Sequence, residues 1–175
     1  MGQAIFFSST LFAIFALAMQ RPPEAADPPS PTAPASLSIQ GVGLQQTSVT
    51  SSDLATMPRR TVTIKDKDEA EVRYEGVTVH DLLSKAGMKF GQSMRGTRLR
   101  DFLLAESADD YGVIFAIPEL TDEFSDGVVL VADRANGAPI TGRDGPLRLI
   151  ATQDKKHARW VRNVASLTIQ SAPAR

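Results

Sequence analysis

The chain has 175 residues, a net charge of −1 and 42% hydrophobic residues, with an isoelectric point of about 6.1. These are the proportions of one ordinary globular domain, and they argue against a general nucleic-acid-binding protein. The chain contains no cysteine, which excludes disulfides, thiolate metal ligands, cysteine nucleophiles and lipid attachment through a thiol.

The N-terminus carries an apolar run, Ala4–Met19, without an acidic or basic residue. The run is long enough for the hydrophobic region of an export signal and shorter than a usual membrane span. We predict a signal peptide over residues 1–18, with Ala16-Leu17-Ala18 as the cleavage motif and Ala25-Ala26 as an alternative. No Lys or Arg precedes the run, so an uncleaved membrane anchor is the competing interpretation. Both place the remainder outside the cytoplasm, either periplasmic or secreted.

Residues 19–36 are rich in Pro, Ala and Ser and can bury little apolar surface. This composition predicts a disordered or polyproline-like linker. The folded domain is therefore expected over residues 37–170, which is enough chain for one hydrophobic core and too little for two.

The first half of the domain shows alternation typical of strands at 37–39, 60–64 and 70–74, the last two joined by a charged turn at 65–68. A short helix is expected between a cap at Ser51 or Ser52 and a stop at Pro58.

The period of the apolar residues then changes. Glu75-Gly76 is predicted to turn the chain, and Thr78 to cap a second helix that ends at Gly87. Val79, Leu82, Leu83 and Ala86 form the apolar stripe of this helix.

The second half is predicted to contain five more strands, at 99–105, 111–117, 128–132, 147–150 and 164–169, with a short helical turn at Pro118–Leu120. The almost wholly apolar 128–132 segment should be covered on both faces. Asn136-Gly137 and Asp144-Gly145-Pro146 are turn signals. The pattern favours an α+β fold of mostly antiparallel sheet with a few short helices on its margin.

A basic run follows the 147–150 strand in the sequence and contains Lys155, Lys156, His157, Arg159 and Arg162. Asp154 is the only acidic residue beside it. Such a cluster suits an anion such as phosphate or carboxylate. The alternative is a solvated basic loop, the commoner outcome for a charge run.

Other candidates each have a plain structural alternative. His80 beside Asp81 could act as a base or simply face water, and Asp109-Asp110-Tyr111 could aim carboxylates into a cleft or form a turn. Trp160 could stack on a ligand or fill the core. The acidic group at 119–126 lacks the spacing of a calcium loop, His157 has no second metal ligand nearby, and no nucleophile-elbow or phosphate-loop motif is present.

Six segments resemble, in order, the molybdopterin-binding domain of the sulfite-oxidase family in its short, stand-alone bacterial form. They are YEGVTVHDLL (74–83), ADDY (108–111), the apolar 128–132 segment, NGAPI (136–140), GPLRLI (145–150) and ARWVRNV (158–164).

The resemblance implies an α+β fold with several sheets. In that family, backbone groups and basic side chains of a C-terminal block, here residues 136–164, hold the phosphate and ring of the pterin. Arg148 falls in the family's G-x-P-L-R-L strand, and Arg159 and Arg162 in its R-x-V-K pattern. Lys156 lies in the preceding loop. These four residues are the expected cofactor-binding residues.

Three departures from the family's pattern count against an enzyme. Catalytic members hold molybdenum through a cysteine thiolate, so we expect no protein-ligated molybdenum, no metal-binding residue and no catalytic residue in this chain. Ala151-Thr152 also replaces the proline-glycine that usually follows the family's strand, and a compact turn at 65–68 stands where longer members have the metal-ligand loop.

The first hypothesis is therefore an exported, non-catalytic binding or accessory module for molybdopterin, a pterin-like ligand or another anion. The second is a molybdopterin-dependent oxidoreductase subunit without cysteine ligation, and the third a structural interaction domain without a pocket. We expect a monomer whose partner is a periplasmic redox or signalling protein, and membrane contact only if the N-terminal segment stays uncleaved.

Overall fold

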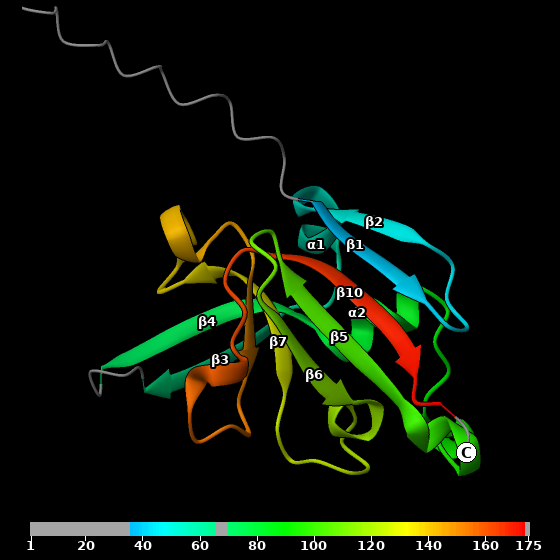
Figure 1. Ribbon diagram of the computed structural model, residues 1–175. Coiled ribbons are helices and arrows are strands. Elements are labelled where there is room, and N and C mark those ends of the chain that lie inside the picture. Colours follow the sequence, from blue (N-terminus) through cyan, green and yellow to red (C-terminus); the bar gives the residue numbers. More distant parts are fainter. Residues whose placement is uncertain (1–35, 66–69, 174–175) are drawn as a thin grey trace, which may run out of the picture. The chain divides into compact units, whose positions relative to one another are not determined.

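Two five-stranded sheets share one hydrophobic core in the computed structural model (Figure 1), which describes residues 36–65 and 70–173. The predicted signal peptide, the predicted linker up to residue 35 and most of the predicted turn at 65–68 lie outside the described residues. The described part belongs to one unit by its internal contacts.

The first sheet has the order β2 (Thr47–Thr50), β1 (Ser36–Gly41), β10 (Val164–Ser171), β5 (Asp101–Ser107), β6 (Gly112–Ala116). Only β1 and β10 run parallel, and the other neighbours are antiparallel. In β5 the residues that point inward, such as Leu103 and Ala105, are fully buried. The alternation that predicted these strands therefore reflects one buried and one outward face.

The second sheet has the order β3 (Arg60–Lys65), β4 (Glu71–Thr78), β7 (Val129–Ala135), β8 (Ala138–Pro139), with β9 (Arg148–Ala151) also paired to β7. All of these pairs are antiparallel. The predicted α+β fold of mostly antiparallel sheet is confirmed.

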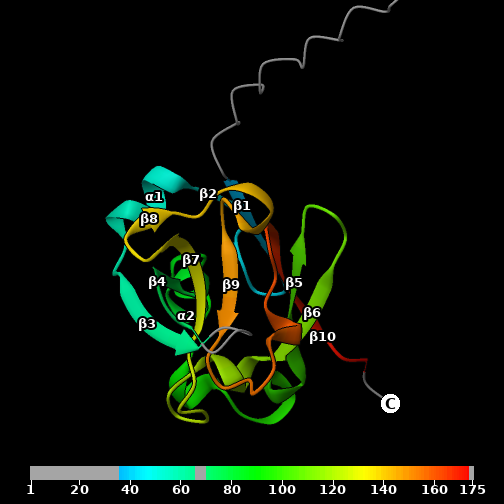
Figure 2. The same cartoon turned by 90° about the vertical axis from the view of Figure 1, so that its left-hand side faces the viewer.

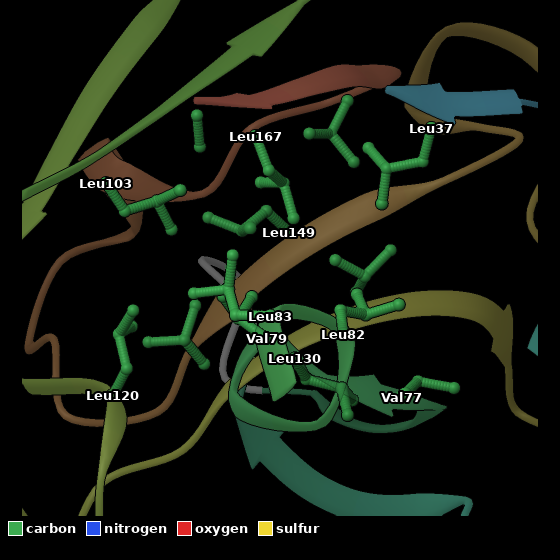
Figure 3. Close-up of a cluster of buried hydrophobic side chains, with 14 of the residues drawn as sticks. Leu37, Val77, Val79, Leu82, Leu83, Leu103, Leu120, Leu130, Leu149 and Leu167 are labelled. Atoms are coloured by element: carbon green, nitrogen blue, oxygen red, sulfur yellow. The ribbon is translucent and has the colours of Figure 1, made fainter. Parts of the chain in front are cut away.

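Helix α2 (Val79–Lys85) begins where predicted, because the Thr78 side chain accepts a hydrogen bond from the backbone N–H of Asp81. Val79, Leu82 and Leu83 are fully buried, and Figure 3 shows them among core leucines of both sheets. The sequence had suggested a helix on the margin of the sheet, whereas this helix is part of the core.

Helix α1 (Ser51–Thr56) is capped by Thr50 and not by Ser51 or Ser52. The Thr50 hydroxyl accepts from the backbone N–H of Asp53, whose carboxylate accepts from the backbone N–H of Thr50. Reciprocal bonding of this kind fixes the helix start one residue earlier than a cap at Ser51, and two earlier than a cap at Ser52, would predict. Within residues 36–65 and 70–173, no helix has the length and apolar character needed to cross a membrane.

Glu75-Gly76 is not a turn, because β4 continues through it to Thr78. The pairing of β4 with β7 shifts register between these two residues, which marks a β-bulge. A Cβ on Gly76 would lie 2.0 Å from the carbonyl oxygen of Val131. The glycine is needed for close approach of the two strands and not for a change of direction.

Strand β7 carries the predicted apolar segment, and Val129–Ala132 are all buried. It turns at Asn136 and Gly137, both with positive φ, into β8, as the dipeptide predicted. Figure 2 shows β9 and the orange segment after it between β7 and the β5–β6 hairpin. This position brings the C-terminal block close to both sheets.

Short 3-10 turns complete the fold, at Gly91–Ser93, Gly96–Arg100, Ile117–Leu120, Gly142–Asp144 and His157–Arg159. The turn at Ile117–Leu120 was predicted. The turn at Gly96–Arg100 includes Leu99, which was predicted to start a strand; β5 begins only at Asp101.

Candidate functional site

A pocket of about 640 Å³ opens where the β5–β6 loop meets the C-terminal block. Three stretches that are distant in sequence form it: the end of β5 with the β5–β6 loop, the Gly142–Asp144 turn, and residues 157–163 before β10. The residues that line it are Ser107, Ala108, Asp109, Tyr111, Gly142, Arg143, His157, Ala158, Trp160, Arg162 and Asn163.

The β5–β6 loop supplies the acidic side of the pocket. The backbone N–H of Tyr111 donates to the Ser107 hydroxyl at 3.0 Å, and that hydroxyl donates to the Asp109 carboxylate. This bond, assisted by the positive charge of Arg143, lowers the pKa of Asp109 below its ordinary value. Asp110 adopts a φ of 65°. The segment is thus a turn, as its plainer interpretation held, and it also lines the pocket.

Two stacked rings form the floor. The His157 imidazole lies 3.6 Å from the Trp160 ring, centroid to centroid, with 15° between their planes. Trp160 is buried and donates its indole N–H to the carbonyl oxygen of Ala151, so it belongs to the core and also reaches the pocket. Tyr111 donates its hydroxyl to the carbonyl oxygen of Ala158 beside these rings.

Asp144 joins two of the predicted cofactor-binding arginines. Its carboxylate lies 2.8 Å from Nε of Arg162 and 2.8 Å from a terminal nitrogen of Arg148. The Arg162 side chain is 49% exposed and lines the pocket, whereas Arg148 is 15% exposed. The Arg148 guanidinium lies 5.6 Å from the Trp160 ring and 5.7 Å from the Tyr74 ring. Arg148 therefore supports the pocket from behind.

The Nε of Arg148 is buried, and among the described residues it has no hydrogen-bond partner. A buried donor of this kind is uncommon, because its lost hydration is not replaced. Among the predicted site residues, it is the one buried side-chain nitrogen without a partner in the described chain.

Arg159 turns away from the pocket. Its guanidinium binds Asp154 through two nitrogens at 2.9 and 2.5 Å and Glu119 at 3.1 Å. The same group lies 4.4 Å from the Phe115 ring. The hydrogen bond with Asp154 raises the pKa of Arg159. Two carboxylates already neutralise this arginine, so the structure gives it a clear role in packing.

Lys156 is exposed just before the His157–Arg159 turn and does not line the pocket. Arg143 does line it, on the exposed turn that begins at Gly142. Within residues 36–65 and 70–173 its guanidinium makes no hydrogen bond or close ion pair. The free cation of the pocket is thus one that sequence reasoning did not single out, although the glycines on either side of Arg143-Asp144 mark an exposed turn.

His80 lies elsewhere. Its Nδ1 is 3.4 Å from the Asp81 carboxylate and its ring packs on Phe90 at 4.3 Å. It lines a different hollow, with Asp122 and Asp126. In the part of the chain that the structure describes, no group of three or more His, Cys, Asp or Glu residues is arranged to hold a metal ion.

A family model described as the oxidoreductase molybdopterin-binding domain matches residues 26–175. The chain belongs to this family. The match spans both sheets and every segment of the pocket, and it confirms the resemblance on which the site residues were predicted.

Among solved structures, the chain is similar to the sulfane dehydrogenase SoxCD from Paracoccus pantotrophus, with a TM-score of 0.59 and 24% sequence identity. The similarity covers 77% of this chain and 37% of that one, so this domain spans a little over a third of its structural relative. At that identity the likeness establishes the fold. A search of curated proteins found no match.

The pocket fits part of the family's cofactor. Arg143 and Arg162 suit a phosphate, and the His157–Trp160 stack presents an aromatic surface to a ring. The metal part of the cofactor would lack the family's protein ligand, because the chain has no cysteine to donate a thiolate to molybdenum.

Proposed function

We propose that this domain is a binding module, without redox catalysis of its own, that holds a pterin-like anionic ligand in the pocket beside Trp160. The observation that carries the proposal is the joint presence of a free arginine, Arg143, a half-exposed arginine, Arg162, and a stacked ring pair on one concave surface. A phosphate would lie against the arginines and a flat ring against the stack.

The Asp109 carboxylate shapes the selectivity of this pocket. Like an ordinary aspartate it is ionised at neutral pH, so it disfavours a ligand with negative charge at both ends. A pterin offers amide and amine N–H groups to such an acceptor. The proposed ligand is therefore anionic at one end and a hydrogen-bond donor at the other.

The test uses Trp160, the only tryptophan of the chain, as an intrinsic fluorescent reporter. Neopterin monophosphate is titrated into the full chain, with neopterin and inorganic phosphate as separate ligands. We expect the phosphorylated pterin to quench Trp160 and to bind at least tenfold more tightly than either part alone, since both ends of the pocket are then used.

Arg143→Ala is the sharpest variant, because its guanidinium makes no hydrogen bond to any other described residue. It should weaken binding of the phosphorylated pterin about tenfold and leave neopterin binding unchanged, given a charge-assisted contact of roughly 1.5–3 kcal/mol. Arg73→Ala, an exposed arginine on β4 outside the pocket, is the matched control. Equal affinities for the two variants would overturn the proposal.

Family membership supports an alternative, an oxidoreductase subunit that carries molybdopterin without a protein thiolate on the metal. Metal and pterin analysis separates the two. The chain is purified from the periplasm of a host that makes molybdenum cofactor, a source that also tests the proposed export. About one molybdenum and one pterin per chain would favour the oxidoreductase subunit, whereas pterin binding without molybdenum would favour the binding module.

A further inference from the structure

The segment from Leu82 to Arg100 contains five Lys or Arg residues and no Asp or Glu. The whole chain carries a net charge of −1, so the remaining residues are net acidic. This basic segment lies outside the pocket proposed above.

The fold places this segment at one end of the first sheet, where β1 and β10 end and β5 begins (Figure 1). A second pocket, of about 440 Å³, opens there. Three of the five cations line it, Lys89, Arg98 and Arg100. We refer to this pocket and its rim as the basic end.

The positive charge of the basic end is only partly neutralised. Asp101 is the one carboxylate among the lining residues, and it already accepts from the Ser171 hydroxyl and lies 3.9 Å from Nε of Arg98. Arg100 donates to the carbonyl oxygen of Ala172 at 2.7 Å, a bond that positions it without cancelling its charge. The Lys89 ammonium has no ion pair or hydrogen bond to any residue that the structure describes.

Apolar side chains lie beside these cations. Val42 lines the same pocket and is 57% exposed, and Leu99, between Arg98 and Arg100 in the chain, is 46% exposed. A pocket for a small inorganic anion has no need of exposed aliphatic side chains. Apolar residues surrounded by charged residues are typical of protein–protein interfaces.

We propose that the basic end is a docking surface for an acidic partner protein, which places a carboxylate beside Lys89 and an apolar side chain against Val42 and Leu99. The positive charge of the basic end would attract such a partner during approach and would raise the association rate at low salt. This inference stands independently of the pterin pocket.

The test uses the full chain and a defined probe, a fluorescein-labelled peptide of alternating Glu and Leu residues. A peptide with Gln in place of Glu is the uncharged match. Fluorescence anisotropy should show binding of the acidic peptide, at least tenfold weaker binding of the Gln peptide, and an affinity that falls as sodium chloride rises from 25 to 150 mM, because salt screens exposed charges.

Two variants separate charge from apolar contact. Lys89→Glu should weaken binding of the acidic peptide tenfold or more and flatten its salt dependence. Leu99→Ala should weaken it about threefold with the salt dependence unchanged. Lys155→Glu makes the same charge change at an exposed lysine outside the basic end and should keep the affinity within about twofold; circular dichroism confirms that each variant is folded.

Equal losses for Lys89→Glu and Lys155→Glu would overturn the inference, because net charge alone would then explain binding. Binding to phosphatidylglycerol vesicles without binding to the peptide would overturn it in favour of a membrane surface. Complete displacement of the peptide by millimolar phosphate would also overturn it, in favour of a small-anion site. Arg143→Ala should leave peptide binding unchanged, so failure of either proposal can be told from failure of the other.

Discussion

Residues in one basic run have different roles once their partners are known. Arg162 faces the pocket and shares Asp144 with Arg148, whereas Arg159 is held by Asp154 and Glu119. The run shows only that positive charge is concentrated in this part of the sequence. Whether a cation is available to a ligand depends on carboxylates elsewhere in the chain, because a carboxylate partner already neutralises the charge of a paired cation.

Arg159→Ala should lower the free energy of unfolding by about 1–2 kcal/mol. It removes two carboxylate contacts and the bond to the carbonyl oxygen of Ile114 on edge strand β6, and hydrogen bonds to charged groups contribute roughly 1.5–3 kcal/mol before solvent screening reduces them. Urea unfolding measures the loss. Lys156→Ala should change stability by less than about 0.5 kcal/mol, and equal effects of the two changes would contradict this assignment.

Asp109 should make stability depend on pH on the acid side. Its pKa is lowered in the folded state, chiefly by the Ser107 hydroxyl, so its contribution is present above the ordinary value of 3.8 and is lost as pH falls through the lower folded value. Asp109→Asn should therefore reduce the free energy of unfolding at neutral pH, and the difference from the unmodified chain should shrink below pH 3.8.

Ser107→Ala provides the companion measurement, because it removes the largest cause of the shift and keeps the carboxylate. Its pH profile should move in the same direction as that of Asp109→Asn. A constant difference in stability across the acid range for both variants would show that Asp109 does not act through its ionisation.

The four cofactor-binding residues predicted from the sequence were chosen by their position in or near a motif. A motif gives no information about the distances between side chains in the folded structure. Arg162 lies on the pocket and Arg148 directly behind it, while Lys156 and Arg159 do not line it. Arg143 was overlooked because its turn lies outside the basic run. The motif and the pocket share Arg162, and which other side chains reach the pocket depends on long-range pairing that no local pattern encodes.

At the scale of elements, local periodicity predicted most strands because each has one buried and one outward face. It misread Glu75-Gly76 as a turn, since a glycine in a bulge and a glycine in a turn look alike without the partner strand. It also placed the α1 cap on a serine and missed β2 (Thr47–Thr50). The parallel pairing of β1 with β10 joins the two ends of the domain and has no local signal.

Two glycines in strands offer a matched test of this interpretation. Gly76→Ala should destabilise the protein by about 3 kcal/mol or more, because the new Cβ would overlap the carbonyl oxygen of Val131 at 2.0 Å and the strands would have to separate. Gly112→Ala on β6 should stay within about 1 kcal/mol, since its Cβ would meet the Leu104 side chain at an ordinary 3.5 Å. Thermal unfolding of both variants measures the difference, and similar melting temperatures would contradict the proposed bulge.

At the scale of the whole domain, β5 connects the two proposed binding surfaces. Its first residue, Asp101, lines the basic end, and its last, Ser107, lines the pterin pocket. Seven residues of strand separate the two by roughly 20 Å. A ligand and a protein partner could therefore bind at the same time, without competing for the same surface, as expected of an accessory module that presents a bound ligand to a larger assembly.

The final prediction concerns where the folding unit begins. Leu37 and Ile39 on β1 are fully buried, and β1 pairs with both β2 and β10. A chain that starts at Ser36 keeps these contacts, so it should still unfold in one cooperative transition.

Removal of residues 1–41 should instead abolish folding. Burial of each aliphatic side chain contributes roughly 1.5–3 kcal/mol, and loss of β1 would also leave β10 without its parallel partner. Together these losses approach the roughly 5–15 kcal/mol that stabilises a typical domain. Circular dichroism and urea unfolding of both truncated chains test the boundary: a cooperative transition in the shorter one would show that β1 is dispensable and that the core is centred on the second sheet alone.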